Sequence, residues 1–202
     1  MKGILGKQYT GKLMQNNRIN IIHDFRFIDR LDPLLDELKK QNISEYKLWS
    51  PVEDVKSVVR SINLSHKQIV QWAKENEMPY VIIAEDDLMF TCDGAWEYFL
   101  ENMPPNFDLY LGCTYIVPIQ NNKICGFHLY AVREQFYDAF LSTPEDVHID
   151  TEMNNIAGNY FFCYPFPALQ RKGFSLNNKA VVDYNSVLEE KDKYSAAVYN
   201  IS

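Results

Sequence analysis

Several features that mark large protein classes are missing from this sequence, and each absence excludes one class. No stretch comes near the roughly 20 consecutive apolar residues that a transmembrane helix needs. Residues 1–20 mix basic and polar residues and lack the apolar core of a signal peptide. Asp and Glu outnumber Lys and Arg, and the net charge of −7 argues against binding nucleic acid through its phosphates. We therefore predict a cytoplasmic protein that does not bind nucleic acid.

Cysteine-based metal sites and disulfide frameworks are excluded in the same way. The cysteines are irregularly spaced and form no C-x-x-C pair, so we predict buried, reduced thiols. They are Cys92, Cys113, Cys125 and Cys163. No stretch rich in Pro, Gly and Ser divides the 202 residues, and 47% apolar content is enough for one sizeable core. A single domain is the expected organisation.

What the sequence does contain is an alternation of strand and helix patterns, which is typical of an α/β fold. Strands are predicted at 18–25, 45–49, 80–84, 107–111, 124–132 and 161–164, and helices at 29–41, 57–77, 93–103, 133–141 and 147–152. Within the second helical region, Ser65 is expected to cap a helix, with Gln68 completing a capping box. Residues 116–123 are expected to form the turn of a hairpin.

The most informative stretch is residues 80–90, where an apolar run ends in three consecutive carboxylates, Glu85, Asp86 and Asp87. Such a run indicates a strand buried on both faces, as in a parallel sheet covered by helices. Ligands of these sheets bind beyond the carboxyl ends of the strands. Alternation along a strand sends Glu85 and Asp87 to one side and Asp86 to the other. Because adjacent carboxylates repel one another, a bound divalent cation is the simplest explanation for all three.

Other stretches add to this pattern in a particular order. Ser65-His66 opens a helical stretch about 20 residues before the acidic triplet, a spacing that the short loops of α/β units allow. Residues 83–87 read Ile-Ala-Glu-Asp-Asp, and Pro165, Gln170 and Ser175 follow later in the chain. Together these stretches resemble glycosyltransferase family 25, the lipooligosaccharide-type and collagen-type galactosyltransferases. Residues 126–130 and Ile149-Asp150 fall where that family has a G-x-x-x-Y strand and an acidic residue.

The resemblance implies a GT-A fold, a Rossmann-like arrangement with a mixed, mainly parallel sheet. It covers residues 18–185, leaving an N-terminal arm at 1–17 and a C-terminal tail or helix at 186–202. The implied activity is inverting transfer of a hexose, preferably galactose, from a UDP-sugar. The implied acceptor is a glycan such as lipooligosaccharide or another cell-envelope polysaccharide. Contact with the inner face of a membrane is left open, and the sequence predicts no oligomeric state.

For the metal, the resemblance and the residue types together indicate Asp87 and Glu85, with His128 as a third ligand. Oxygen ligands suit Mn²⁺ or Mg²⁺, which would stabilise the departing diphosphate as a Lewis acid. His128 lies in an apolar strand, so a hydrogen-bonded core histidine is the alternative interpretation.

A second set of residues is assigned to the donor nucleotide sugar. The family's Arg-rich first loop corresponds here to residues 22–30, whose sequence differs from the family pattern. For Ser65 the alternative is the helix cap described above. The donor-binding set is His23, Asp24, Arg30, Ser65, His66, Glu85, Asp86 and Gln170.

An inverting transfer requires a base that takes the proton of the acceptor hydroxyl. Asp150 is the first candidate for this base and Glu152 the second. The alternative for Asp150 is an N-cap of the short helix that follows it.

Two other functions use similar residues. A metal-dependent phosphohydrolase also clusters carboxylates, but such sites recruit further His and Asp from several strands, and this chain has only four His. A catalytically inactive glycosyltransferase-like binding module is the other alternative. It would be favoured if Asp87 or Asp150 pointed away from the crevice.

Overall fold

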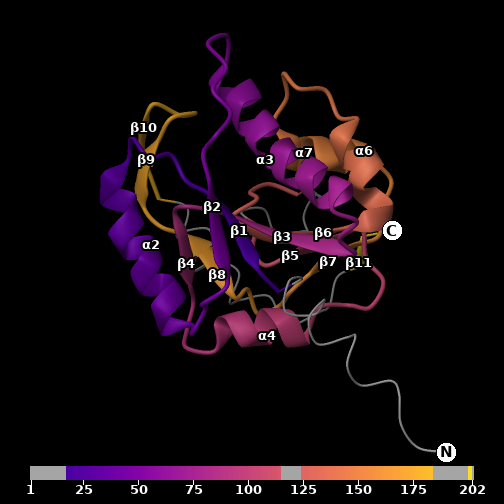
Figure 1. The fold of residues 1–202 in the computed structure, drawn as a ribbon, viewed down its shortest axis with the longest axis horizontal. Coiled ribbons are helices and arrows are strands. Elements are labelled where there is room, and N and C mark those ends of the chain that lie inside the picture. Colours follow the sequence, from indigo (N-terminus) through magenta and orange to yellow (C-terminus); the bar gives the residue numbers. More distant parts are fainter. Residues whose placement is uncertain (1–16, 115–123, 184–199, 202) are drawn as a thin grey trace, which may run out of the picture.

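A computed structural model describes residues 17–114, 124–183 and 200–201. A seven-stranded sheet runs through the middle of this part of the chain (Figure 1). β1, β2, β3, β5 and β7 are parallel to one another, and β6 and β11 are antiparallel to them. This is the mixed, mainly parallel sheet that the sequence predicts. Across the sheet the strands are β11 (Asn200–Ile201), β7 (Tyr160–Phe162), β5 (Leu109–Leu111), β6 (Leu129–Arg133), β3 (Tyr80–Glu85), β1 (Ile19–Ile22) and β2 (Tyr46–Trp49).

Helices cover both faces of this sheet (Figure 1). Their bounds are α2 (Ile28–Lys40), α3 (Val58–Glu75), α4 (Ala95–Glu101), α6 (Tyr137–Leu141) and α7 (Ile149–Glu152), with short 3-10 turns η1 (Glu134–Phe136) and η2 (Met153–Asn155). One core lies between the sheet and α2 with α4, and the other between the sheet and α3, α6 and α7. The helices thereby form an outer layer on each side of the strands.

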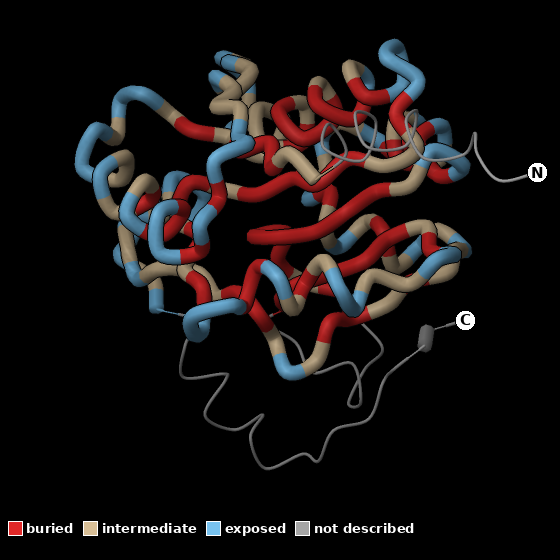
Figure 2. Tube along the Cα trace, turned by 60° about the horizontal axis from the view of Figure 1, so that its bottom comes forward, coloured by how far each residue is buried: buried red, intermediate tan, exposed pale blue. Residues whose placement is uncertain are grey.

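β3 is buried on both faces, as predicted, because alternate residues enter different cores. Ile82 and Ala84 pack in the core with α2 and α4, and Val81 and Ile83 pack in the core with α3. Figure 2 shows buried segments running through the middle of the molecule, with partly exposed and exposed segments around them. Truncating either fully buried isoleucine to Ala would cost about 2–5 kcal/mol of stability.

The start of α3 differs from the prediction. The helix is continuous from Val58, and Ser57 caps it by accepting a hydrogen bond from Arg60 N at 3.4 Å. Ser65 is therefore inside the helix, so its predicted role as a cap was wrong. Its hydroxyl instead donates to Ser61 O at 2.6 Å, one turn earlier. The helix therefore begins about two turns before the expected start.

Two element boundaries also move. The strand predicted at 124–132 begins only at Leu129 and continues to Arg133, which was assigned to the following helix. Gly126 has a φ of +98°, a conformation that favours glycine, so residues 124–128 form an irregular segment that leads into β6. This segment carries His128 to the end of the strand.

Two small sheets lie beside the main one, and the sequence patterns did not indicate them. One pairs β4 (Leu88–Phe90) with β8 (Ala168–Gln170), and the other is a hairpin of β9 (Gly173–Ser175) and β10 (Ala180–Val182). In the register of the first, Leu88 lies opposite Gln170. This pairing brings the C-terminal part of the chain to the acidic end of β3.

Some predictions concern residues outside the described ranges. These are the N-terminal arm apart from Asn17, the hairpin turn at 116–123 and most of the C-terminal segment 186–202, whose residues Asn200–Ile201 form the edge strand β11. Of the cysteines, Cys113 and Cys163 are buried as predicted, whereas Cys92 is exposed and Cys125 is partly buried. Among the described helices, none has the length and apolar character needed to cross a membrane.

Candidate metal centre and adjoining cavity

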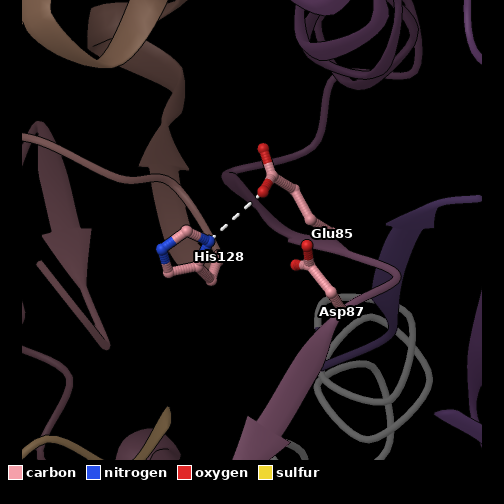
Figure 3. A group of neighbouring side chains, drawn as sticks. All are labelled: Glu85, Asp87 and His128. Atoms are coloured by element: carbon pink, nitrogen blue, oxygen red, sulfur yellow. Dashed lines mark hydrogen bonds and ion pairs between the residues drawn. The ribbon is translucent and has the colours of Figure 1, made fainter. Parts of the chain in front are cut away.

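Three potential metal ligands meet where β3 and β6 lie side by side. Glu85 is the last residue of β3, Asp87 follows it in a turn, and His128 immediately precedes β6. One ligand atom from each lies within 4.8 Å of the others, and His128 Nδ1 is 3.2 Å from Glu85 Oε2 (Figure 3). The strand register causes this meeting, since Glu85 N donates to His128 O at 3.2 Å. The sequence-predicted ligands thus lie together, and their role as ligands stays a prediction.

Asp87 is the member of this group whose charge is least compensated. Its Oδ2 accepts a hydrogen bond from Gln170 Nε2 at 2.7 Å, but Oδ1 is buried and no described residue donates to it. Burial and the neighbouring charge of Glu85 raise the pKa of Asp87 to about 6. A carboxylate oxygen in this situation is a ready ligand for a cation.

Glu85 has the opposite environment although it is adjacent. Burial alone would raise its pKa, but hydrogen bonds from His128 and His66 outweigh this and lower the pKa well below its usual range. His66 Nε2 is 3.3 Å from Glu85 Oε1, and His66 Nδ1 is 2.8 Å from the Tyr130 hydroxyl. Burial opposes the charged form of His128, yet the hydrogen bond and charge of Glu85 raise its pKa overall. Glu85 is therefore an ionised carboxylate held between two imidazoles.

Asp86 points to the other side of the strand end, as strand alternation predicts. His23 Nδ1 lies 2.9 Å from its Oδ2, Asp24 N donates to the same oxygen at 3.3 Å, and Arg30 donates to Oδ1 at 2.7 Å. Arg30 also donates to Phe174 O in β9. Asp86 thereby joins the first loop to the end of β3, and both of its oxygens are engaged by protein donors.

Gln170 and Arg171 approach Asp87 from β8. Besides the side-chain bond of Gln170, the backbone N–H of Arg171 donates to Asp87 O at 2.6 Å. The side chain of Arg171 extends to Glu37 of α2, with Nη2 3.3 Å from Glu37 Oε1. These contacts fix the direction of the Asp87 carboxylate relative to the rest of the site.

A cavity of about 400 Å³ opens beside the acidic strand end. Its walls come from the loop after β1, the loop between β2 and α3, the start of α3, the acidic strand end and the β9–β10 hairpin. Seven of the eight residues predicted to bind the donor line it. They are Asp24, Arg30, Ser65, His66, Glu85, Asp86 and Gln170.

The remaining predicted residues lie elsewhere. His23 is fully buried behind Asp86, outside the cavity lining. Asp150 and Glu152 belong to α7 and do not line the cavity either. Asp150 Oδ2 accepts a hydrogen bond from Gly126 N at 2.6 Å, which ties it to the segment that carries His128. The N-cap of α7 is His148, so the alternative assignment of Asp150 as an N-cap was wrong.

Sequence reasoning missed part of the cavity wall. Val52, Asp54 and Val55 follow β2, and Phe174 and Leu176 belong to the hairpin. Val52, Asp54 and Val55 follow the carboxyl end of a parallel strand, and a position at such an end also drew attention to the acidic triplet. The hairpin residues gave no such signal, because no pattern in the sequence indicated that β9 and β10 fold over this edge.

Comparison with known proteins reveals similarity only in structure. No protein-family model and no curated protein matches the sequence. A glycosyltransferase involved in the glycosylation of the major capsid of PBCV-1 has a TM-score of 0.50 and 11% identity, over 87% of this chain and 98% of that one. A197 from STIV has a TM-score of 0.45 and 16% identity, over 82% and 92%.

A mutant of Drosophila β1,4-galactosyltransferase 7, in complex with manganese, UDP-Gal and xylobiose, has a TM-score of 0.39 and 14% identity, over 61% of this chain and 51% of that one. The similarity to the PBCV-1 enzyme, together with the strand order and the layers of helices, shows that the chain has the predicted GT-A fold. No comparison shows membership of family 25, which stays a prediction.

Proposed function

We propose that this protein is a metal-dependent glycosyltransferase whose donor is a nucleoside diphosphate sugar. One arrangement carries the proposal: Glu85, Asp87 and His128 gather at the carboxyl edge of the parallel strands, beside a cavity of about 400 Å³. The carboxyl edge is where ligands of open α/β sheets bind, and the volume lies within the range of small-molecule sites. The fold alone does not identify the function, because one fold supports many activities.

The residues fit a divalent cation. Two carboxylates and one imidazole are ligands that Mn²⁺ accepts, and Asp87 Oδ1 is a buried oxygen to which no described residue donates. A bound Mn²⁺ or Mg²⁺ would supply Lewis-acid stabilisation of the diphosphate as it departs. Gln170 holds the second oxygen of Asp87 and so keeps its carboxylate directed at this position.

The chain's own basic groups have a matching role. Arg30 and Arg171 both line the cavity. Arg30 Nη1 lies 3.8 Å from Asp87 Oδ2, and the backbone N–H of Arg171 donates to Asp87 O. In the proposed complex these guanidiniums contact the donor phosphates, for which their planar donors are suited. Asp86 and His23 position Arg30 rather than contacting the donor.

Asp150 is the proposed base for the acceptor hydroxyl, and Glu152 is the alternative. Asp150 is supported as the base by its hydrogen bond from Gly126 N, two residues from His128. Its place outside the lining of the donor cavity also fits the inactive binding module. A base on the opposite side of the reacting carbon from the leaving group is what a single inverting displacement requires. Asp150 removes the proton as the hydroxyl attacks.

The finer assignments rest on the sequence resemblance to family 25. They are UDP-galactose as donor, Mn²⁺ as the metal and a cell-envelope glycan such as lipooligosaccharide as acceptor. In this proposal the enzyme works in the cytoplasm, and contact with the inner face of a membrane is left open. Selection between epimeric sugars depends on contacts within the pocket.

The test is release of nucleoside diphosphate by the purified full chain from a panel of sugar nucleotides, with and without Mn²⁺. We expect turnover of at least one sugar nucleotide that requires Mn²⁺ and falls at least about 100-fold in Asp87→Asn. The matched control is Asp29→Asn, an exposed residue in the first turn of α2, with unchanged turnover.

Other outcomes separate the alternatives. Phosphate release from phosphomonoesters without action on sugar nucleotides would identify a phosphohydrolase. Nucleotide binding without turnover would identify an inactive binding module. Absence of both binding and turnover would contradict all nucleotide-sugar functions.

A further inference from the structure

We infer that the cavity holds the donor's base by its flat faces instead of reading its hydrogen-bonding edge, so that the protein accepts several different nucleoside diphosphates. The inference rests on the proposed function, because it assigns the part of the cavity beyond the metal centre. It specifies the substrate class more closely by predicting weak selection of the base.

The cavity wall combines two kinds of chemistry. Around the acidic strand end the lining is charged, whereas the loop after β2, the start of α3 and the hairpin contribute apolar side chains. Besides Pro51 and Val52, the apolar residues that these elements contribute are Val55, Val58, Ile62, Phe174, Leu176 and Val182. Three of these come from one wall and three from the hairpin, so the apolar groups face the cavity from two separate elements.

Several of these side chains remain accessible to solvent. Val55 is fully exposed, and Phe174 and Leu176 are 44% and 39% exposed. Apolar side chains that stay accessible while lining a cavity indicate a surface that a ligand covers. An aromatic ring together with aliphatic side chains suits a flat heteroaromatic ring, which stacks on such groups whichever base it belongs to.

The charged side chains in the same region are already paired with one another. Both carboxylate oxygens of Asp24 accept hydrogen bonds from Arg26, at 2.6–3.0 Å. Asp54 Oδ2 accepts from Arg60 at 2.9 Å, and its Oδ1 accepts from Lys56 N at 2.8 Å. For these side chains to recognise the hydrogen-bonding edge of a base, that edge would have to displace the hydrogen bonds that they already make.

The hydroxyl groups of Ser61 and Ser65 in α3 are engaged in the same way. Ser61 Oγ accepts from Asp54 N at 2.9 Å and lies 3.1 Å from Ser57 O, to which it donates. Ser65 Oγ accepts from Val52 N at 2.9 Å and donates to Ser61 O. Because exchanging a made hydrogen bond for another gains little free energy, these groups provide little discrimination between bases.

A nucleotide base is a better occupant than a lipid chain. The apolar lining is continuous with the metal centre in one cavity, so a ligand held there by its phosphates would place its adjoining group against this lining. A volume of about 400 Å³ is suited to a nucleotide-sized ligand, while an isoprenoid chain needs a long groove.

The experiment is calorimetric titration of the Mn²⁺-loaded full chain with UDP, CDP, GDP, ADP and inorganic pyrophosphate. We expect the four nucleotides to bind within about fivefold of one another and at least about tenfold more tightly than pyrophosphate. Phe174→Ala should weaken all four by about tenfold and leave pyrophosphate unchanged. Val181→Ala is the control, because Val181 is on the same hairpin, 65% exposed and outside the cavity lining.

The outcomes separate this inference from the proposed function. One nucleotide binding more than about 50-fold more tightly than the rest would overturn the inference, because edge readout produces such ratios. Nucleotides that bind no better than pyrophosphate would also overturn it, and would favour a donor whose phosphate carries a lipid. If neither nucleotides nor pyrophosphate bind, the proposed function fails as well. Should Phe174→Ala not fold, Phe174→Leu tests the same contact and is expected to weaken the nucleotides by a smaller factor.

Discussion

The two sides of the end of β3 carry adjacent carboxylates with opposite surroundings. On one side Asp86 is satisfied by His23, Asp24 N and Arg30, and it holds the first loop in place. On the other side Asp87 has a buried oxygen to which no described residue donates, and a pKa raised to about 6 by burial and by Glu85. Asp86 therefore stabilises the fold, whereas Asp87, the next residue, keeps a carboxylate oxygen to which no described residue donates.

This difference shows how a candidate binding site is embedded in a stable fold. Strand alternation sends consecutive side chains to opposite sides, so a single strand end supports both tasks. Incompletely satisfied polar groups cost stability and gather where a ligand completes them. Mutation of Asp86 should therefore lower the stability of the fold, whereas mutation of Asp87 should weaken ligand binding.

The largest expected effect is on the Asp86 side. Asp86→Asn removes the negative charge that Arg30 and His23 surround, and it should lower the free energy of unfolding by about 2–4 kcal/mol, because it leaves a buried ion pair broken. Urea denaturation at pH 8 measures it, with Asp29→Asn as an exposed control. A loss below about 0.5 kcal/mol would mean that Asp86 does not hold the loop.

Asp87→Asn should have the opposite sign in the metal-free protein. The ordinary pKa of 3.8 is raised to about 6 in the folded state, so the ionised carboxylate costs stability increasingly from about pH 4 to pH 6 and fully above that range. Removing the charge should raise the free energy of unfolding by about 1–3 kcal/mol at pH 8. Below about pH 4 the carboxyl is protonated in both states and the gain should vanish. Urea denaturation at both pH values checks this, and equal gains at both would contradict the electrostatic cause.

The smallest expected effect is the pH dependence of metal affinity. Mn²⁺ needs a deprotonated Asp87, whose pKa is about 6, and a neutral His128, whose pKa is raised above its ordinary value, chiefly by Glu85, against the effect of burial. Affinity should rise with pH through this region, by about tenfold per pH unit for each proton displaced. Calorimetry between pH 5.5 and 8 measures this slope, and a flat profile would indicate that Mn²⁺ binds elsewhere.

The sequence was most informative where local rules decide the structure. The apolar run of β3, its burial on both faces and the division of Glu85 and Asp87 from Asp86 all follow from periodicity. The presence of His128 beside them depends on the register between β3 and β6, which are more than 40 residues apart. The prediction of His128 as a metal ligand therefore came from the motif resemblance and not from periodicity.

Other features depended on tertiary contacts that no local pattern encodes. Ser65 resembled a helix cap, but α3 begins at Val58, where Ser57 caps it, and Ser65 is inside the helix. His23 was assigned to the donor, yet its imidazole is taken up by Asp86 inside the protein. The hairpin that completes the cavity is short and half-exposed, so its strands gave no clear alternation.

The central claim is that Glu85, Asp87 and His128 form one cation site, and calorimetric titration of Mn²⁺ into the metal-free full chain tests it most directly. We predict that one Mn²⁺ binds per chain. In Asp87→Asn the affinity should fall by more than the roughly 10–100-fold that loss of an outer-shell partner costs. In folded Asp86→Asn the affinity should be retained. Binding of Mn²⁺ that is equally strong in Asp87→Asn, or absent from the wild-type chain, would contradict it.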